Sequence, residues 1–228
     1  MIPNKIKRIW NKNFNKSNWH NLRSIYPISG VFGLDRGVPI DRYYIEEFLI
    51  QNKKYIKGKV LEIAENAYCK KFDSGVTSFE ILHVDDSNKK ATIIGDLTKK
   101  ETLPSNQIDC FVCTQTLNFI YNVSDAVIGI HHLLKPGGIV LATLAGISHI
   151  SRYDMNRWGD YWRFTSLSAK RTFSDVFGKE NVEVNNYGNV LSAIAFLEGI
   201  AVHELSKEEL DYKDNDYQML ITIVAKKV

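Results

Sequence analysis

Short apolar segments that alternate with helical or crossover segments run through most of this sequence. The apolar segments cover residues 60–64, 76–84, 91–95, 108–114 and 139–144. A helical pattern over about 124–134 and a Lys-Pro-Gly-Gly turn precede the last of them. Parallel strands require crossover connections, and the helices in those connections bury both faces of the sheet. The alternation therefore predicts an α/β fold built on a mostly parallel sheet.

The two ends of the alternating region complete this prediction. Residues 181–185 have the pattern of a strand, 189–205 that of a helix and 217–225 that of a long final strand. Ahead of the first strand, a helix is predicted over 39–52, with Asp41 as its cap. Its inward stripe comprises Tyr44, Ile45, Phe48 and Leu49. We expect one Rossmann-like domain with a seven-stranded, mostly parallel sheet, an antiparallel last strand and helices on both faces.

The first 35 residues differ from the rest in charge. Up to residue 34 every charged side chain is a lysine or an arginine, whereas residues 36–228 are close to balanced. Apolar residues recur at helical spacing among these lysines, at Ile2, Ile6, Ile9, Trp10 and Phe14. The sequence thus predicts a basic amphipathic arm (1–35) ahead of the domain (36–228). The arm could pack on its own domain, close over it as a lid, touch an anionic membrane surface weakly, or join two copies in an oligomer.

Composition excludes several other classes of protein. The net charge is +3 and the apolar fraction 44%, both ordinary for a globular chain. No apolar run reaches the roughly 18 residues of a membrane span, and the start lacks the pattern of a signal peptide, so we expect a cytoplasmic protein. Cys110 and Cys113 form a C-x-x-C, but they lie in an apolar strand without a second ligand pair, which favours core packing over a metal site.

Polar residues follow four of the predicted strands. Ligands of an open parallel sheet bind at the carboxyl ends of the strands, where the strand order reverses. The residues at those ends are Ala64 to Tyr68 after the first strand, Glu80 or Asp85 at the second, Asp96 after the third, and Gln115 and Thr116 after the fourth. Their order and spacing predict a ligand site along this edge.

Taken in order, these segments resemble the successive motifs of class I S-adenosylmethionine-dependent methyltransferases. The resemblance rests on residues 60–68, 96–97, 108–117 and 133–144, and its most specific part is the Leu-Lys-Pro-Gly-Gly turn before a strand. Further stretches at 36–44, 160–165 and 187–190 resemble the group found beside glycosyltransferases in bacterial polysaccharide clusters. The resemblance covers about residues 30–228. It implies an enzyme of polysaccharide biosynthesis that binds S-adenosyl-L-methionine and methylates a small acceptor, on an oxygen of a sugar or glycan precursor.

The resemblance also implies which residues contact the cofactor. Glu62, the backbone around Ala64 and the nearby Tyr68 resemble the motif that approaches the methionine part, which Tyr44 could cover. Glu80 resembles the acid that holds the ribose, with Asp85 as the alternative. The remaining cofactor contacts that it implies are Asp96 and Leu97 at the adenine, and Gln115 and Thr116 along the post-strand loop.

The first of these loops departs from the family pattern. The family usually has Gly-x-Gly-x-Gly there, because glycine lets the backbone approach the cofactor closely. This chain has no glycine between Ala64 and Tyr68. The alternative to the enzyme is therefore a degenerate copy of the fold with a binding or scaffolding role. A nucleic-acid methyltransferase is a further alternative, but the chain lacks an Asn/Asp-Pro-Pro-Tyr/Trp motif after the fourth strand, so we expect no nucleic-acid partner.

The segment from 145 to 165 carries the candidate acceptor-binding and catalytic residues. A hydroxyl acceptor needs a base for its proton. His149 is the first choice because the ordinary pKa of histidine lies near neutrality, and Asp160 and Asp154 come next. An aromatic and cationic cluster suited to a sugar face or a phosphate comprises Trp158, Tyr161, Trp162 and Arg163.

Overall fold

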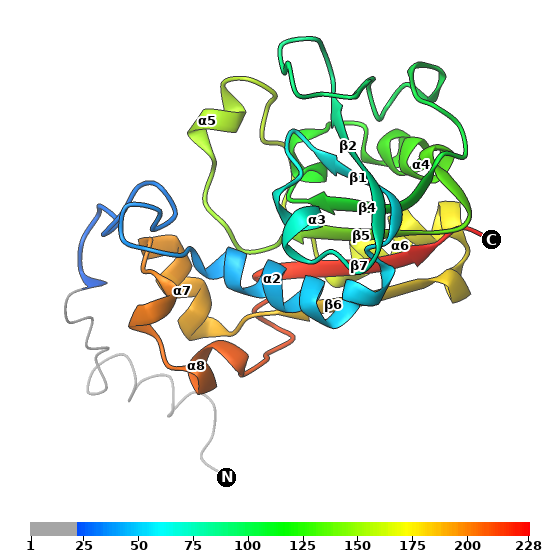
Figure 1. Cartoon of the computed structure of the whole chain (residues 1–228). Coiled ribbons are helices and arrows are strands. Elements are labelled where there is room, and N and C mark those ends of the chain that lie inside the picture. Colours follow the sequence, from blue (N-terminus) through cyan, green and yellow to red (C-terminus); the bar gives the residue numbers. More distant parts are fainter. Residues whose placement is uncertain (1–21) are drawn as a thin grey trace.

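The computed structural model describes residues 22–228 and contains a seven-stranded sheet in the order β3-β2-β1-β4-β5-β7-β6 (Figure 1). Strands β1 to β5 are parallel to one another, and β7 is antiparallel to both of its neighbours, β5 and β6. The strands are β1 (Gly58–Ile63), β2 (Val76–His83), β3 (Ile93–Ile94), β4 (Ile108–Thr114), β5 (Leu134–Ala145), β6 (Val182–Tyr187) and β7 (Leu220–Lys226). This confirms the predicted sheet and its antiparallel last strand.

Helices cover both faces of the sheet. On one face α4 and α6 pack on a core that includes Ala126 and Phe173, and on the other α2 and α7 pack on a core that includes Tyr44 and Phe196. The α-helices are α2 (Ile40–Asn52), α3 (Ala67–Lys71), α4 (Val123–Leu133), α5 (Arg152–Met155), α6 (Ser166–Phe177), α7 (Val190–Glu198) and α8 (Lys207–Asp211). Short 3-10 turns are η2 (Lys53–Tyr55), η3 (Lys100–Thr102), η4 (Leu117–Phe119), η5 (Lys179–Asn181) and η6 (Val202–Glu204).

Strand β4 shows why both faces need cover. Successive side chains of a strand point to opposite faces, so Cys110 and Val112 belong to one core and Phe111 and Cys113 to the other. The two cysteines of the C-x-x-C therefore lie on opposite sides of the sheet. Burial raises the pKa of both thiols, that of Cys113 to about 12. Both cysteines pack as small apolar residues, and their thiols cannot share a ligand.

Two helices differ from the sequence prediction. Helix α6 was not predicted; it begins at a reciprocal cap between Thr165 and Ser168, and it buries Ala169, Phe173 and Phe177, with Val176 packed beside them. So narrow an apolar stripe among serines, threonines and charges is a weak helical signal. The helix expected over 189–205 instead ends at Gly199, whose left-handed backbone stops α7 after nine residues.

The predicted cap of α2 is also different. Pro39 occupies the N-cap position, and no side chain caps the helix there. The Asp41 carboxylate accepts a hydrogen bond only from the neighbouring Arg42 N–H, at 2.9 Å. Asp41 therefore does not close the helix end.

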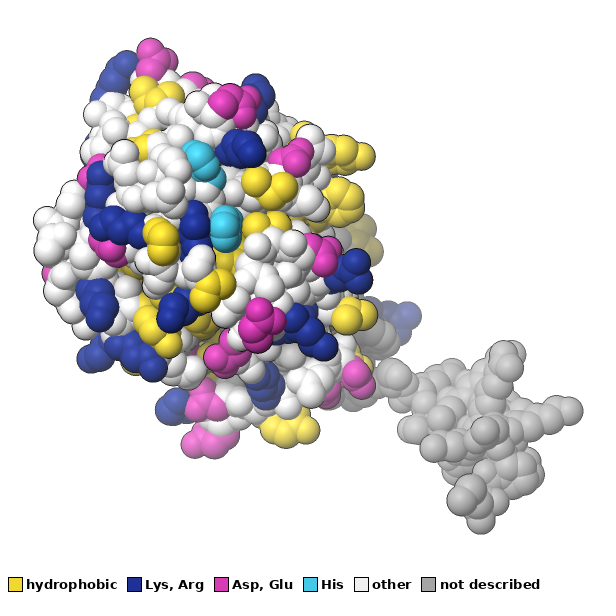
Figure 2. All heavy atoms as spheres, turned by 90° about the vertical axis from the view of Figure 1, so that its right-hand side faces the viewer, with side chains coloured by type: hydrophobic (Ala, Val, Ile, Leu, Met, Phe, Trp, Pro, Cys, Tyr) yellow, Lys and Arg dark blue, Asp and Glu magenta, His cyan; other side chains and the backbone are white. Residues whose placement is uncertain are grey.

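The surface and the chain start complete the description. On the face shown in Figure 2, acidic side chains are interspersed among the lysines and arginines. None of the helices within residues 22–228 has the length and apolarity to cross a membrane. The apolar positions expected along the arm, from Ile2 to Phe14, lie outside the described residues.

Candidate functional site

The larger of two adjoining cavities lies at the carboxyl ends of β1, β2, β3 and β4. Its volume is about 710 Å³. It spans the position where the sheet order reverses between β1 and β4, which is where open α/β sheets bind ligands. Of the residues expected at the cofactor, its wall contains Glu62, Ala64, Tyr68, Asp96, Leu97, Gln115 and Thr116. Sequence reasoning thus placed residues from three separate strand ends on one wall, those of β1, β3 and β4.

The loop after β1 is held by hydrogen bonds that compensate for its lack of glycine. Ala64 has a left-handed backbone, with φ of 62°, which a side chain other than glycine adopts only under strain. Its N–H donates to the Leu82 carbonyl at 3.0 Å, and its carbonyl accepts from the Asn88 amide at 2.7 Å. Alanine thus occupies a backbone conformation that favours glycine, at the point where the chain turns past the cavity.

Glu62, near the end of β1, fixes the start of α3. Its carboxylate accepts hydrogen bonds from the backbone N–H groups of Tyr68 (3.3 Å) and Cys69 (2.9 Å). Burial raises the pKa of Glu62, and it raises the pKa of Tyr68 to about 12. A carboxylate that already serves two N–H donors mainly shapes the loop, while the Tyr68 hydroxyl stays protonated as a hydrogen-bond donor or acceptor.

The loops after β3 and β4 are shaped in the same way. Asp96 accepts hydrogen bonds from the Thr98 N–H (2.9 Å) and the Thr98 hydroxyl (2.8 Å). Gln115, with φ of 47°, has a left-handed backbone, and its N–H donates to the Thr143 carbonyl at 3.0 Å. Two of the four non-glycine residues with positive φ within residues 22–228 are Ala64 and Gln115. Backbone strain is therefore concentrated on the rim of this cavity.

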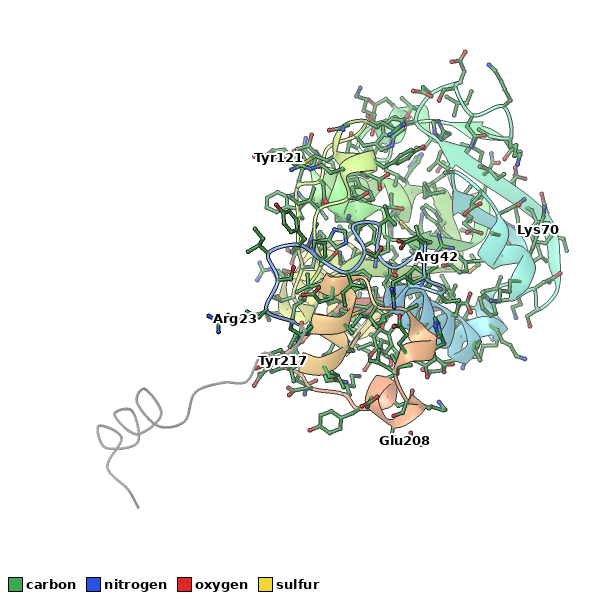
Figure 3. All side chains as sticks on the ribbon, turned by 90° about the vertical axis from the view of Figure 1, so that its left-hand side faces the viewer. Arg23, Arg42, Lys70, Tyr121, Glu208 and Tyr217 are labelled. Atoms are coloured by element: carbon green, nitrogen blue, oxygen red, sulfur yellow. The ribbon has the colours of Figure 1, made fainter. Side chains whose placement is uncertain are left out.

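The smaller cavity, of about 270 Å³, adjoins the larger one beyond the ends of β4 and β5. Gln115, Phe119 and Asp154 line both cavities, so a ligand in one lies next to a ligand in the other. His149 and Asp160, the two residues predicted to be catalytic, line only the smaller one. Figure 3 looks onto this part of the molecule, where the segment leading into α2 crosses the face that also carries Arg42 and Tyr121.

His149 has one ring nitrogen engaged and one without a partner. Its Nδ1 lies 3.1 Å from the Ile150 carbonyl, an acceptor, which assigns the proton of the neutral ring to Nδ1. Nε2 is buried and has no hydrogen-bond partner among the described residues. The ring stacks on Phe32, with 3.8 Å between ring centroids. The arrangement leaves an unprotonated nitrogen on a fixed ring beside the smaller cavity.

Asp160 and Arg163 form a closed pair. The guanidinium binds both carboxylate oxygens, at 2.5 and 2.9 Å, and the Ser151 N–H donates to the same carboxylate. Burial by itself raises the pKa of Asp160, but the hydrogen bonds and charge of Arg163 outweigh it and lower the pKa below its ordinary value. Asp160 is thus a weak base whose oxygens are occupied, in contrast to His149.

The aromatic cluster predicted for the acceptor is divided between different surfaces. Trp158 and Tyr161 line the larger cavity, where Trp158 meets the edge of the His83 ring at 5.8 Å between centroids. Trp162 packs against Tyr121 and donates to the Tyr121 carbonyl at 3.1 Å, on the outer side of the loop. Of the four predicted acceptor residues, only Arg163 lines the smaller cavity.

Three residues expected at the cofactor lie outside the larger cavity. Tyr44 is buried in the core, and its hydroxyl donates to the Leu210 carbonyl at 2.8 Å. Glu80 sits in the middle of β2, where it accepts from Ser78 at 2.7 Å. Asp85 turns toward Ser87, whose hydroxyl donates to it at 2.5 Å. Sequence position near a strand end did not reveal these side-chain directions.

The structure adds residues that the sequence did not single out. Glu65, His83, Phe119 and Tyr121 also line the larger cavity, and Phe32, Asp41 and Asn118 line the smaller one. The glycine-rich sequence around Phe32 was the one available signal for a tight turn there. In the structure Phe32 itself has a left-handed backbone, with φ of 61°. The other residues belong to helices or loops whose contacts depend on distant parts of the chain.

The larger cavity suits the S-adenosylmethionine that the sequence motifs imply. Its volume falls in the range that small-molecule sites occupy. The left-handed turns at Ala64 and Gln115 bring backbone to its rim, as the glycines of the family loop do. Leu97 and Ile120 give the wall apolar surface suited to a flat ring system, and Asp96 offers an acceptor for an amino or hydroxyl group. The residues present therefore fit the cofactor.

Comparison with known proteins supports this assignment. Residues 57–142 match the family model described as a methyltransferase domain. No curated protein matches the chain.

Solved structures share the fold at low sequence identity. A S-adenosylmethionine-dependent methyltransferase from Mesorhizobium loti is 15% identical with a TM-score of 0.53, covering 85% of this chain and 100% of its own. Phosphoethanolamine N-methyltransferase 2 of Haemonchus contortus, in complex with S-adenosyl-L-methionine, is 14% identical with a TM-score of 0.53, covering 93% of this chain and 60% of its own. The [4+2]-cyclase SpnF is also similar, at 14% identity and a TM-score of 0.53 over 90% of this chain and 88% of its own.

These likenesses show the fold, and the domain match adds the class of reaction. The segment matched by the family model, 57–142, contains β1 to β4 and all but three of the residues that line the larger cavity, the exceptions being Asp154, Trp158 and Tyr161. Residues 57–142 thus form a methyltransferase domain, the chain has the fold of S-adenosylmethionine-dependent methyltransferases, and its larger cavity fits S-adenosylmethionine as the cofactor.

Proposed function

We propose that this enzyme methylates a hydroxyl oxygen of a small acceptor, a sugar or glycan precursor, bound in the smaller cavity. The observation that carries the proposal is the unpartnered, buried Nε2 of His149 on that cavity. A hydroxyl becomes a competent nucleophile as its proton leaves, and a neutral imidazole nitrogen is suited to accept that proton. Bound S-adenosylmethionine supplies the activated methyl group.

The chain contributes orientation as well as the base. The hydrogen bond that Nδ1 donates to the Ile150 carbonyl and the stack on Phe32 hold the His149 ring in one orientation and one tautomer. Gln115, Phe119 and Asp154 stand where the two cavities meet, and they would hold the acceptor oxygen against the methyl group. As the acceptor oxygen takes up the methyl group, its proton would pass to Nε2, while the methyl–sulfur bond of S-adenosylmethionine would break and S-adenosylhomocysteine would leave.

A sugar is the acceptor class that the sequence and the smaller cavity jointly favour. The stretches 36–44 and 160–165 resemble enzymes of polysaccharide clusters, and they contribute Asp41, Asp160 and Arg163 to this cavity. We therefore place the reaction in the assembly of a polysaccharide, in the cytoplasm.

His149→Gln tests the proposal. We expect kcat to fall by about 10²- to 10⁴-fold, because glutamine cannot accept the proton, while affinity for S-adenosylmethionine stays unchanged. The rise of kcat with pH on the acidic side should also disappear. Product formation is followed by mass spectrometry on sugars and glycan precursors that gain one methyl group.

The matched control is His132→Gln, a partly buried histidine at the end of α4 away from both cavities. It should keep the activity of the parent protein. If His149→Gln retains both the rate and the pH profile, proton transfer through this residue is wrong.

A further inference from the structure

Arg163, the only arginine among residues 22–228 that lines the smaller cavity, has no donor left for a ligand. Besides the Asp160 carboxylate, its guanidinium donates to the carbonyls of Ser148 (3.2 Å), His149 (2.8 Å) and Trp162 (2.8 Å). Together with the two bonds to Asp160, these contacts use all five N–H groups of Arg163. Arg163 is a clamp for the loop over the cavity, and the phosphate-binding role suggested by its residue type is not open to it.

The cavity presents hydrogen-bond acceptors instead. Asp41 and Asp154 both line it, and neither forms an ion pair among residues 22–228. Asp154 accepts from the Ser151 hydroxyl at 2.6 Å through one oxygen, which leaves the other available. The Asn118 Oδ1 and the His149 Nε2 are buried without a partner among the described residues. Four groups that accept hydrogen bonds thus surround a space that offers no free cationic side chain.

The pKa of Asp41 also reflects the surroundings of its carboxyl group. It raises the pKa of the Asp41 carboxyl to about 6, against the weaker opposing effects of the Arg42 N–H and the Arg42 charge. A carboxyl group in such surroundings gains from hydroxyl donors and would repel a second anion.

The volume and the apolar lining of the smaller cavity further restrict the class of ligand that it can bind. The volume of about 270 Å³ lies below the usual range for drug-sized ligands, and it suits one small ring. Phe32, Phe119, Phe196 and Met219 give the cavity apolar surfaces between the acceptor groups. A sugar ring matches this pattern, because its C–H faces are apolar and its rim carries hydroxyl donors.

We infer that the sugar unit methylated by this enzyme is uncharged, and that Asp41 binds it through its hydroxyl groups, with Asp154 as a second carboxylate contact. The inference rests on the proposed function and adds a restriction to it. We expect a phosphate or carboxylate on the ring to be rejected by this cavity, because it would meet two carboxylates without an ion pair and no free cationic side chain from residues 22–228. Asp41 becomes a residue that determines specificity, although it lies on α2, outside the segments that carry the sheet motifs.

The test is a binding measurement by saturation-transfer NMR on the full chain saturated with S-adenosylhomocysteine. The probes are the methyl glycosides of glucose, galactose, rhamnose and N-acetylglucosamine, with glucose 6-phosphate and galactose 6-phosphate as their anionic counterparts. We expect at least one neutral glycoside to bind and neither phosphate to bind. Asp41→Asn should weaken the bound glycoside by about tenfold or more, since a charged acceptor becomes a neutral amide. Asp154→Asn should weaken it in the same direction.

Asp175→Asn is the matched control, because Asp175 is an exposed carboxylate on α6 that pairs with Arg171. It should leave glycoside binding unchanged. Three outcomes would overturn the inference: a sugar phosphate that binds better than its neutral counterpart, equal binding by Asp41→Asn and the parent protein, or no binding by any glycoside.

Methyl transfer is measured separately, so that the two proposals can fail independently. Glycosides that bind through Asp41 but gain no methyl group would support the inference and count against the proposed reaction. A methylated anionic acceptor, with no glycoside bound, would support methyl transfer and remove the inference.

Discussion

The two adjoining cavities are built from the chain in different ways. The larger one is walled mainly by the ends of consecutive strands, from Glu62 to Asn122, with three residues added by the loop around α5. The smaller one takes single residues from distant places, among them Phe32, Asp41, Phe196 and Met219. The first cavity depends on backbone turns that the sheet holds in place. The second depends on side chains whose positions are set by other side chains.

This difference teaches where each cavity is vulnerable. The cofactor site is formed by four loops at the sheet edge. The loss of one side chain from one loop therefore leaves the other three loops in place. The loop over the acceptor cavity depends on one clamp, the Asp160–Arg163 pair. The comparison therefore predicts large effects at a few residues on the acceptor side and moderate effects spread over the cofactor side.

The largest effect on stability is expected from Arg163→Ala. The change leaves Asp160, whose side chain is 1% exposed, without its partner, and an uncompensated buried charge costs about 3–5 kcal/mol of the free energy of unfolding. Urea unfolding gives the value, and Arg171→Ala is the control. Arg171 pairs with Asp175 on the surface, at 81% and 58% exposure, so its loss should cost less than about 1 kcal/mol. If both variants lose the same free energy of unfolding, the Asp160–Arg163 pair stabilises the protein no more than a surface ion pair does.

A moderate effect is expected on the cofactor side from Asp96→Ala. It removes one carboxylate from the larger cavity but leaves the strand ends in place, so affinity for S-adenosylhomocysteine should fall by about 10- to 100-fold, or about 1.4–2.8 kcal/mol. Isothermal titration measures it. Asp86→Ala, in the loop beyond β2 and outside the cavity wall, is the control and should bind like the parent protein. Complete loss of binding in Asp96→Ala would contradict the idea of distributed support.

The smallest effect is expected from Asp41→Asn on stability, and it has the opposite sign. The pKa of Asp41 is raised from 3.8 to about 6 by burial, so above about pH 6 the folded state carries a charge that the unfolded state solvates better. The cost grows as pH rises from about 4 to 6 and is constant above that. Removing the charge should therefore stabilise the protein by about 1–2 kcal/mol at pH 8 and by nothing below about pH 4.

Unfolding in urea at the two pH values measures this effect, with Asp175→Asn as the exposed control. A stabilised protein that binds the sugar less well would mean that Asp41 is retained for binding at a cost to stability. Unchanged stability at pH 8 would mean that the carboxyl is better solvated than its burial indicates.

The sheet and the cofactor cavity could be largely predicted from the sequence because their signals are local. The predicted strand at 108–114 coincides with β4, since an apolar run between turn residues has little freedom to be anything else. Residues immediately after such a strand lie at the carboxyl edge whatever the rest of the chain does. For this reason Asp96, Gln115 and Thr116 were found together on one wall.

The acceptor cavity could not be predicted in the same way. The residue type of Arg163 suggested a ligand contact, but its hydrogen bonds to a returning loop decide its role. Tyr44 was predicted at the cofactor and is buried against Leu210, from a helix with no visible link to it in the sequence. Such outcomes depend on contacts between distant segments, and no local pattern encodes them.

The stack of Phe32 on His149 bears on when the enzyme becomes active during its own synthesis. The Phe32 ring stacks on the His149 ring and also lies against Phe196, so three segments far apart in the sequence meet at the proton acceptor. Contacts across such long separations close large loops and tend to form late in folding. A partly folded chain would therefore lack an ordered proton acceptor, and methyl transfer would begin only in molecules in which these three segments have come together.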